Sequence, residues 1–146
     1  MDESGNLNRF LQQQDADYPA ALAQIRRDRK ESHWMWYIFP QLRGLGQSTM
    51  AWCYGIADLR EARAYLEHPV LGRRLREITQ VALECGETNA VRLFGWPDSM
   101  KFRSCMTLFA QVSGDDLFDR ALERFFDGQP DRMTLQLLQE KESGDR

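Results

Sequence analysis

One short segment of the chain combines bulky aromatic rings with polar groups that could hold a small ligand. It contains His33, Trp34, Trp36 and Gln41. Indole rings exclude water and stack on planar groups, while a few polar groups fix the orientation of a ligand. Histidine is a common general acid or base in enzymes, so His33 could serve as one. The Gln41 amide could bind a carbonyl or amide group.

Two glycines, Gly44 and Gly46, follow in the same segment. Their backbone amides could bind an anion, because glycine permits turns that point successive N–H groups outward. The pair lacks the third glycine, the preceding strand and the following acidic residue of a dinucleotide-binding motif. The alternative for the segment is structural, a buried helix and an ordered loop with Trp34 and Trp36 packed in the core.

A second candidate group is Lys101 with Ser104, which lie three residues apart and so on one face of a helix. Asp98 could pair with Lys101, and the lysine and serine together could bind a phosphate or carboxylate. The order reverses the Ser-x-x-Lys motif of acyl-enzymes, and no Gly-x-Ser-x-Gly motif occurs, which argues against a serine nucleophile. The candidate catalytic residues are therefore His33, Lys101 and Ser104, and the alternative is an ordinary surface ion pair.

No metal or cofactor is expected from the remaining reactive residues. The two histidines lie far apart in sequence, and the three cysteines are odd in number and form no Cys-x-x-Cys pair. This pattern argues against a zinc site and a disulfide framework, and reduced thiols are typical of cytosolic proteins. His68 precedes Pro69, so its imidazole should lie at a helix junction and cap backbone carbonyls there.

The elements that would position these residues are helices. Hydrophobic residues make up 42% and charged residues 28% of the 146 residues, a composition typical of one globular domain. Apolar residues recur at helical spacing, and no stretch alternates with the period of a strand. The sequence predicts an all-α, predominantly helical, compact single domain of about seven to nine short helices with little or no sheet. It should span residues 6–140, with flexible tails at 1–5 and 141–146.

Start and stop signals place the individual helices. Two amphipathic helices should open the chain, separated by a turn at residues 15–17. Residues 33–39 are apolar on all sides and predict a buried helix. Asp58 and Glu61 have the spacing of a capping box, and the run that ends at Gly86 predicts a long amphipathic helix. The other expected caps are Ser48, Asp98, Asp115 or Asp116, and Asp131.

The charge balance argues against nucleic acid as a partner. A net charge of −3 gives no general attraction to phosphate backbones. The one dense basic cluster is Arg26, Arg27, Arg29 and Lys30, at the end of a predicted helix, where cations stabilise the negative end of the helix dipole. No apolar run is long enough to cross a membrane and no secretory signal opens the chain, so a cytoplasmic protein is expected.

Four segments together resemble one bacterial family through their order and spacing. They are NRFL (8–11), SHWMWYIFPQLRGLG (32–46), HPVLG (68–72) and KFRSCMTLF (101–109). Over residues 6–138 the chain resembles domain-of-unknown-function family 1810, whose name states that no activity is assigned. Some members carry a calpastatin label that nothing in this sequence supports. The chain has Cys105 where the family usually has a serine, so this position should belong to the core.

Two functional hypotheses from different classes follow. HPVL (68–71) and the next helix are similar to small helical domains proposed to act on ADP-ribose derivatives, an analogy of fold alone. The first hypothesis is therefore a pocket that binds, or also processes, a planar anionic small molecule such as a nucleotide or an ADP-ribose derivative. The second is a protein interaction or homo-oligomeric module without catalysis, in which Trp52 and Trp96 extend an aromatic surface. Whether the protein is an enzyme stays open.

Overall fold

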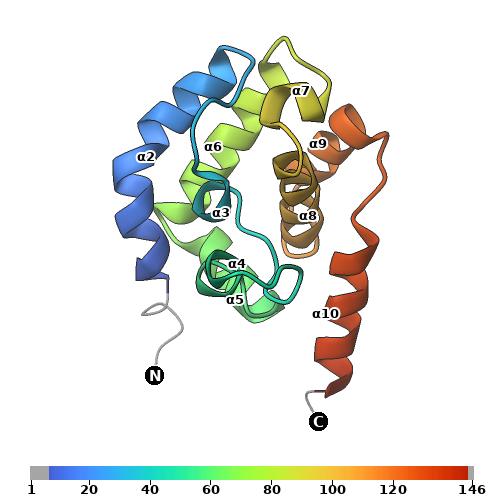
Figure 1. Ribbon diagram of the computed structural model, residues 1–146. Helices are drawn as coiled ribbons and strands as arrows, with labels where there is room; N and C mark the ends of the chain where they lie inside the picture. The colour runs from blue at the N-terminus through green and yellow to red at the C-terminus, as the bar shows by residue number, and fades with distance from the viewer. Residues whose placement is uncertain (1–6, 145–146) are drawn as a thin grey trace.

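Helices make up most of residues 7–144, the part of the chain that the computed structural model describes (Figure 1). They are α2 (Asn8–Arg26), α3 (Met35–Ile38), α4 (Thr49–Cys53), α5 (Leu59–Glu67), α6 (Leu71–Glu84), α7 (Ala90–Phe94), α8 (Asp98–Ala110), α9 (Leu117–Phe126) and α10 (Arg132–Gly144). Within this part of the chain no strand forms, and one isolated bridge pairs Leu42 with Ile56. The predicted all-α fold of seven to nine helices is confirmed for the described residues.

Helix α8 lies at the centre of the packing and contacts α3, α5, α7, α9 and α10. Its fully buried side chains include Phe102, Cys105, Met106 and Phe109. The Phe102 ring stacks on Phe94 with centroids 4.3 Å apart and meets Phe39 edge-on at 5.1 Å. Aromatic pairs in these geometries add to the free energy of burial. Cys105 belongs to this core, as expected.

Helix α2 is continuous, so the prediction of two opening helices separated by a turn is wrong. Asp15 and Asp17 engage other elements instead of forming a turn. Asp15 pairs with Arg74 of α6, and Asp17 accepts a hydrogen bond from the Tyr37 hydroxyl. The buried Gln14 side chain donates to the Tyr37 carbonyl oxygen at 2.7 Å. These tertiary contacts keep helical a stretch whose local composition favours a turn.

Most of the predicted helix caps are confirmed. The hydroxyl of Ser48 and the carboxylates of Asp58 and Asp131 each accept a hydrogen bond from the backbone N–H three residues later, at the starts of α4, α5 and α10. At the start of α9 the accepting carboxylate is that of Asp115 rather than Asp116. Each cap satisfies an N–H group that has no partner within its helix.

Asp98 does not cap α8, contrary to the prediction. Pro97 precedes the helix, and no side chain caps it. Asp98 lies in the first turn, and its carboxylate binds the ammonium groups of Lys30 and Lys101. Ion pairing with two cations is a stronger interaction for a carboxylate than one backbone N–H, so the side chain turns away from the helix end.

The junction between α5 and α6 contains His68 and Pro69. Helix α5 ends at Glu67, as the proline predicts. The prediction that His68 caps carbonyls is wrong, because its Nδ1 accepts hydrogen bonds from the backbone amides of Val70 and Leu71. The free groups at the start of α6 are N–H donors, and an unprotonated ring nitrogen is an acceptor.

The aromatic segment is less helical than expected. Only Met35–Ile38 forms a helical turn, and the buried Trp34 and Phe39 flank it with non-helical backbone. The chain then continues as a loop to Ser48. The prediction of a buried helix over residues 33–39 is therefore right for one turn only.

The last helix, α10, extends to Gly144 and so passes residue 140, where the helical domain was expected to end. Residues 1–6 and 145–146 lie outside the described residues, and with them the tail predicted at 1–5. Among the helices of residues 7–144, none is both long enough and apolar enough to span a bilayer.

Candidate functional site

A hollow of about 350 Å³ lies where the loop after α3 meets the first turns of α8 and the start of α10. Its lining residues are Trp36, Gln41, Leu45, Gly46, Pro97, Met100, Lys101, Ser104, Asp131 and Met133. We call it the Trp36 pocket. It brings together five of the eight residues expected at a ligand site, which are Trp36, Gln41, Gly46, Lys101 and Ser104.

A chain of charged and aromatic groups forms one wall of the Trp36 pocket. The Lys101 Nζ lies 4.5 Å from the centroid of the Trp36 ring and 3.1 Å from Asp98 Oδ1. The Lys30 Nζ lies 2.8 Å from the other oxygen, Asp98 Oδ2. Two ammonium groups thus share one carboxylate, so the cluster of Lys30, Asp98 and Lys101 carries one positive charge in excess. The pocket lining also includes the Asp131 carboxylate, which has no ion-pair partner within residues 7–144.

The Asp98 carboxyl has a lowered pKa. Burial acts to raise the pKa of Asp98, but the hydrogen bonds and charges of Lys30 and Lys101 outweigh it, and the pKa falls below the ordinary value of 3.8. The folded state therefore binds this proton more weakly than the unfolded chain does. Stability from Asp98 is fully present above the unfolded pKa and is lost as pH falls through the folded pKa.

We expect an Asp98→Asn variant to lose less stability on acidification than the natural protein. The natural protein should lose the contribution of this carboxylate as pH falls below the unfolded value, whereas asparagine has no proton to gain. Urea unfolding at about pH 6 and about pH 3 measures the difference. An equal loss in both proteins would show that Asp98 contributes nothing to the loss of stability at acidic pH.

Gln41 and Gly46 shape the far side of the pocket. The Gln41 side chain is nearly buried yet makes no side-chain hydrogen bond within residues 7–144. A Cβ at Gly46 would lie 2.8 Å from the Ala51 Cβ, 3.8 Å from Gln41 Nε2 and 4.0 Å from the Trp36 ring. Glycine at this position lets the loop pack against α4, and it leaves the Gln41 amide free to bind a ligand.

Ser104 is held by neighbouring acceptors. Its buried hydroxyl lies 3.1 Å from the Met100 carbonyl oxygen and 3.1 Å from Asp131 Oδ2. The same Asp131 oxygen accepts hydrogen bonds from the amide and the hydroxyl of Thr134 at the start of α10. This arrangement ties α10 to α8 and engages the Ser104 hydroxyl at the edge of the pocket.

Two other predicted ligand-binding residues lie outside the Trp36 pocket. Trp34 is 1% exposed, and its indole Nε1 donates to Gln24 Oε1 at 2.9 Å, which places it in the core. Gly44 is exposed in the loop with φ +110°, and a Cβ there would meet Leu137 at 3.6 Å. Trp34 and Gly44 therefore fit the structural alternative, in which the tryptophan packs in the core and the glycine belongs to an ordered loop.

His33 is exposed beside the pocket rather than inside it. It lines a smaller hollow of about 60 Å³, whose lining also includes Trp36 and Asp98. Its backbone carbonyl accepts a hydrogen bond from the Tyr37 hydroxyl at 3.2 Å. Lys101 contacts the same Trp36 and Asp98. Trp36 therefore lies between two hollows, one lined by His33 and the other by Lys101.

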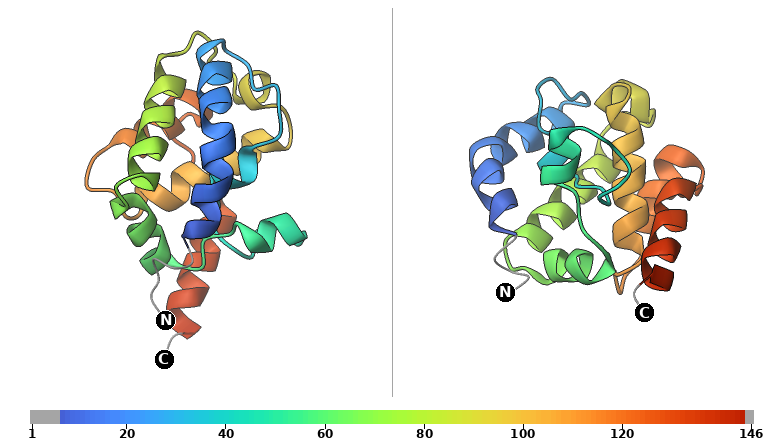
Figure 2. Two further views of the ribbon diagram at one scale, coloured as in Figure 1. Left: turned by 90° about the vertical axis from the view of Figure 1, so that its left-hand side faces the viewer. Right: turned by 60° about the horizontal axis from the view of Figure 1, so that its bottom comes forward.

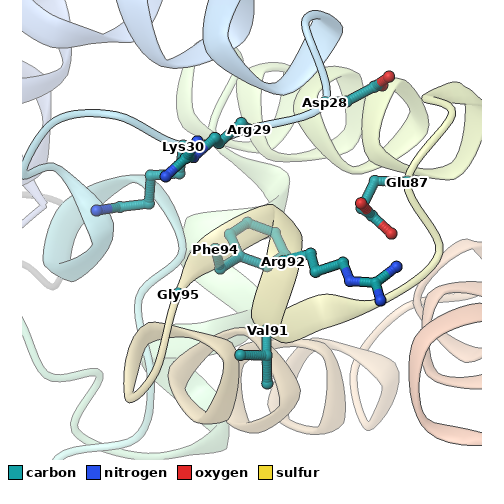
Figure 3. Close-up of a pocket in the computed structure, with 8 residues that line it drawn as sticks. All are labelled: Asp28, Arg29, Lys30, Glu87, Val91, Arg92, Phe94 and Gly95. Atoms are coloured by element: carbon teal, nitrogen blue, oxygen red, sulfur yellow. The ribbon is translucent and has the colours of Figure 1, made fainter.

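A further hollow of about 450 Å³ opens where the loop after α2 approaches α7 (Figure 3). Its charged residues do not converge on one point. Figure 3 shows the side chains of Lys30 and Arg92 extending in opposite directions. The Asp28 carboxylate is engaged by the backbone amide of Gly86 at 2.8 Å. We therefore place the candidate site in the Trp36 pocket.

The three residues that join α7 to α8 and the first residue of α8 each line a different hollow. Gly95 lines the hollow of Figure 3, Pro97 lines the Trp36 pocket, and Asp98 lines the small hollow of His33. Trp96 lines a fourth, open groove. We call these residues, 95–98, the α7–α8 corner.

Several site residues were not predicted from the sequence as parts of a pocket. Lys30 was assigned to a surface basic cluster, but its side chain is only 7% exposed and pairs with Asp98. Asp131 was predicted as a cap, and nothing local indicates that it reaches Ser104 of α8. Within residues 7–144 no three His, Cys, Asp or Glu side chains gather as metal ligands would.

Comparisons with known proteins agree with the fold and bring no activity with them. A family model described as "Protein of unknown function (DUF1810)" matches residues 4–138. The chain is also similar to the crystal structure of the conserved hypothetical protein Rv1873 from Mycobacterium tuberculosis. That match has 42% identity and a TM-score of 0.89, and it covers 92% of this chain and 96% of the other. No curated protein matches the chain.

Proposed function

The chain belongs to the DUF1810 family of proteins of unknown function, and we propose that its Trp36 pocket binds a small planar anion of the nucleotide or ADP-ribose class. The observation that carries the proposal is the shared carboxylate of Asp98. Because Lys30 and Lys101 both pair with it, Asp98 does not fully neutralise Lys101, the one cation among the residues that line the pocket. A phosphate or carboxylate on a ligand would supply the missing negative charge.

The rest of the pocket lining suits a planar ring attached to that anion. Trp36 provides an aromatic surface, and Pro97 and Met100 provide an apolar wall. The Gln41 amide, which has no side-chain partner in the described chain, can donate and accept hydrogen bonds with a ring carbonyl or amine. A volume of about 350 Å³ is at the low end for ligand pockets, so we expect it to take one ring and one anionic group.

The proposal is for binding, with catalysis left as an addition to it. The hydroxyl of Ser104 is engaged, and Lys101 is held by Asp98. His33 adjoins the pocket at Trp36 and is the group best placed to exchange a proton with a bound ligand. We also propose that the protein acts in the cytosol, where free thiols such as those of its three cysteines stay reduced.

We expect at least one compound of a panel of AMP, ADP, NAD and ADP-ribose to stabilise the protein against heat. A ligand at about 100 times its dissociation constant adds roughly 2.7 kcal/mol to the free energy of unfolding. Lys101→Met should weaken that binding by about tenfold or more, because it removes the cation that meets the anion. Thermal unfolding with each compound, followed by calorimetric titration, makes the measurement.

An Arg63→Met variant is the matched control, because Arg63 is an exposed cation of α5 that lines no described hollow. It should bind like the natural protein. Trp36→Ala should weaken binding as Lys101→Met does. The proposal fails if no compound stabilises the protein, or if both pocket variants bind as tightly as the control.

The interaction module expected as the alternative is favoured by one observation. Helix α4 projects from the rest of the molecule in the left view of Figure 2. It carries Trp52, whose side chain is 66% exposed under the Arg43 guanidinium, 4.4 Å from the ring centroid. An exposed tryptophan paired with arginine is a common anchor in protein interfaces. Light scattering that gives a mass above the 17.1 kDa of one chain would favour this second function.

A further inference from the structure

A second groove, of about 440 Å³, is formed by residues of α7, α8 and α9 and by the α7–α8 corner. Its lining includes Val91, Trp96, Met100, Arg103, Arg124 and Asp127. We call it the Trp96 groove. It shares Met100 of the apolar wall with the Trp36 pocket and none of that pocket's other lining residues.

The Trp96 groove gathers apolar side chains that face solvent. Trp96 is 74% exposed, Val91 52% and Met100 43%. These are three of the six large hydrophobic side chains that are exposed within the described residues. Scattered apolar residues on a surface need no explanation, whereas a cluster in one groove is typical of a binding site.

Two arginines in the same groove lack a carboxylate partner. No ion pair within residues 7–144 includes Arg103 or Arg124, although Arg74 and Arg76 both have one. Arg103 Nε donates to the Gln129 carbonyl oxygen at 2.9 Å. The lining contains one acidic residue against two guanidinium groups, so the groove has a positive charge in excess.

Arg124 is the less satisfied of the two arginines. One of its terminal nitrogens donates to the Cys85 carbonyl oxygen, but its buried Nε has no hydrogen-bond partner in the described structure. Its guanidinium lies 5.5 Å from the centroid of the Phe125 ring, which supplies only a weak interaction. The buried Nε is closed to a ligand in the groove. An acidic group bound there would instead supply the anion that the Arg124 guanidinium lacks.

We propose that the Trp96 groove binds a small organic acid, whose apolar part packs on Trp96 and Val91 and whose anionic group meets Arg103 and Arg124. The exposed apolar side chains indicate the apolar part of the ligand, and the unpaired guanidinium groups indicate its anionic group. The shared chemistry is one carboxylate, sulfonate or phosphate on an apolar body. This site is independent of the Trp36 pocket, because it uses neither Trp36 nor Lys101.

The test uses the fluorescent probe 1-anilinonaphthalene-8-sulfonate, an aromatic sulfonate, with the full chain. Its emission should rise to saturation with the natural protein. Val91→Glu places a carboxylate at the exposed edge of the groove and should weaken the affinity by about tenfold or more. Arg103→Lys, which keeps the charge but loses the planar fork, should weaken it less. Met50→Glu makes the same change at another exposed apolar residue, on α4, and should leave the affinity unchanged.

Competition tests the need for charge. Phenylacetate should displace the probe, and phenylacetamide, its neutral counterpart of nearly the same shape, should not. The proposal is overturned if the probe does not saturate, if Val91→Glu binds it like Met50→Glu, or if phenylacetamide displaces it equally well. Lys101→Met should leave probe binding intact and weaken the nucleotide panel, so the two sites fail separately.

Discussion

Replacing Phe102 by alanine should lower the free energy of unfolding by about 3–5 kcal/mol, the range for removing a fully buried phenylalanine. The Phe102 side chain is 0% exposed. Its ring contacts four others, those of Phe39, Phe94, Phe125 and Phe126. Alanine would leave a cavity between α3, α7, α8 and α9 that close-packed neighbours cannot fill. Urea unfolding measures the loss.

The effect of Phe102→Ala should reach the Trp96 groove, because Phe102 packs against two of its lining residues, Phe125 and Phe126. Met100 of the same helix lines both this groove and the Trp36 pocket. Met50→Ala is a suitable control for stability, because Met50 is 39% exposed and should change the free energy of unfolding by no more than about 0.5 kcal/mol. A loss for Phe102→Ala as small as that of the control would show that α8 is not the centre of the packing.

Replacing Arg9 by methionine should cost about 3 kcal/mol, because it would leave the buried Glu61 carboxylate without its cation. The Arg9 Nη2 lies 3.0 Å from Glu61 Oε1, and the Glu61 side chain is 3% exposed. The same guanidinium donates to the carbonyl oxygens of Cys53, at 2.7 Å, and Gly55, at 2.9 Å. Arg9 thus joins α2 to α5 and to the end of α4.

A double variant separates the ion pair from the packing of Arg9. Arg9→Met with Glu61→Gln should recover part of the lost stability, since the uncompensated charge is gone and a glutamine can still accept a hydrogen bond from the Ala57 amide. Arg63→Met, at an exposed arginine, should be nearly neutral. If Arg9→Met were equally neutral in urea unfolding, the buried pair would contribute nothing.

The local features of the fold could be predicted from the sequence. Helical spacing and Gly86 predict α6, and the cap at Asp58 predicts the start of α5, because each signal depends on neighbours within a few residues. The continuity of α2 could not be predicted in this way. Asp17 remains helical because it accepts a hydrogen bond from Tyr37, and that contact exists only in the folded chain.

The pair Trp34 and Trp36 shows how far the sequence reaches at the site. Trp34 lies just before the single turn of α3 and is buried, whereas Trp36 lies within that turn and is half-exposed. The pattern does not decide which of the two is buried. Trp34 is the buried one because Gln24 of α2 accepts a hydrogen bond from its indole N–H, a contact between distant segments.

The role of Lys30 could not be predicted from neighbouring residues either, because it also depends on a contact between distant segments. Lys30 follows Arg26, Arg27 and Arg29, which indicates a solvated basic cluster at the end of a helix. Its side chain instead reaches Asp98 at the start of α8. The excess positive charge of the cluster of Lys30, Asp98 and Lys101 depends on this contact. The sequence therefore indicated an anion site at Lys101, but it did not indicate the shared carboxylate that is the main support for that site.

The α7–α8 corner is one short stretch of backbone that contributes to all four hollows. Gly95, Trp96, Pro97 and Asp98 follow one another directly, so the corner cannot shift toward one hollow without shifting relative to the other three. A ligand that displaced this corner would change the affinity of the neighbouring hollows for their own ligands. Thermodynamic reciprocity would then require each of those ligands to change the affinity of the first by the same factor.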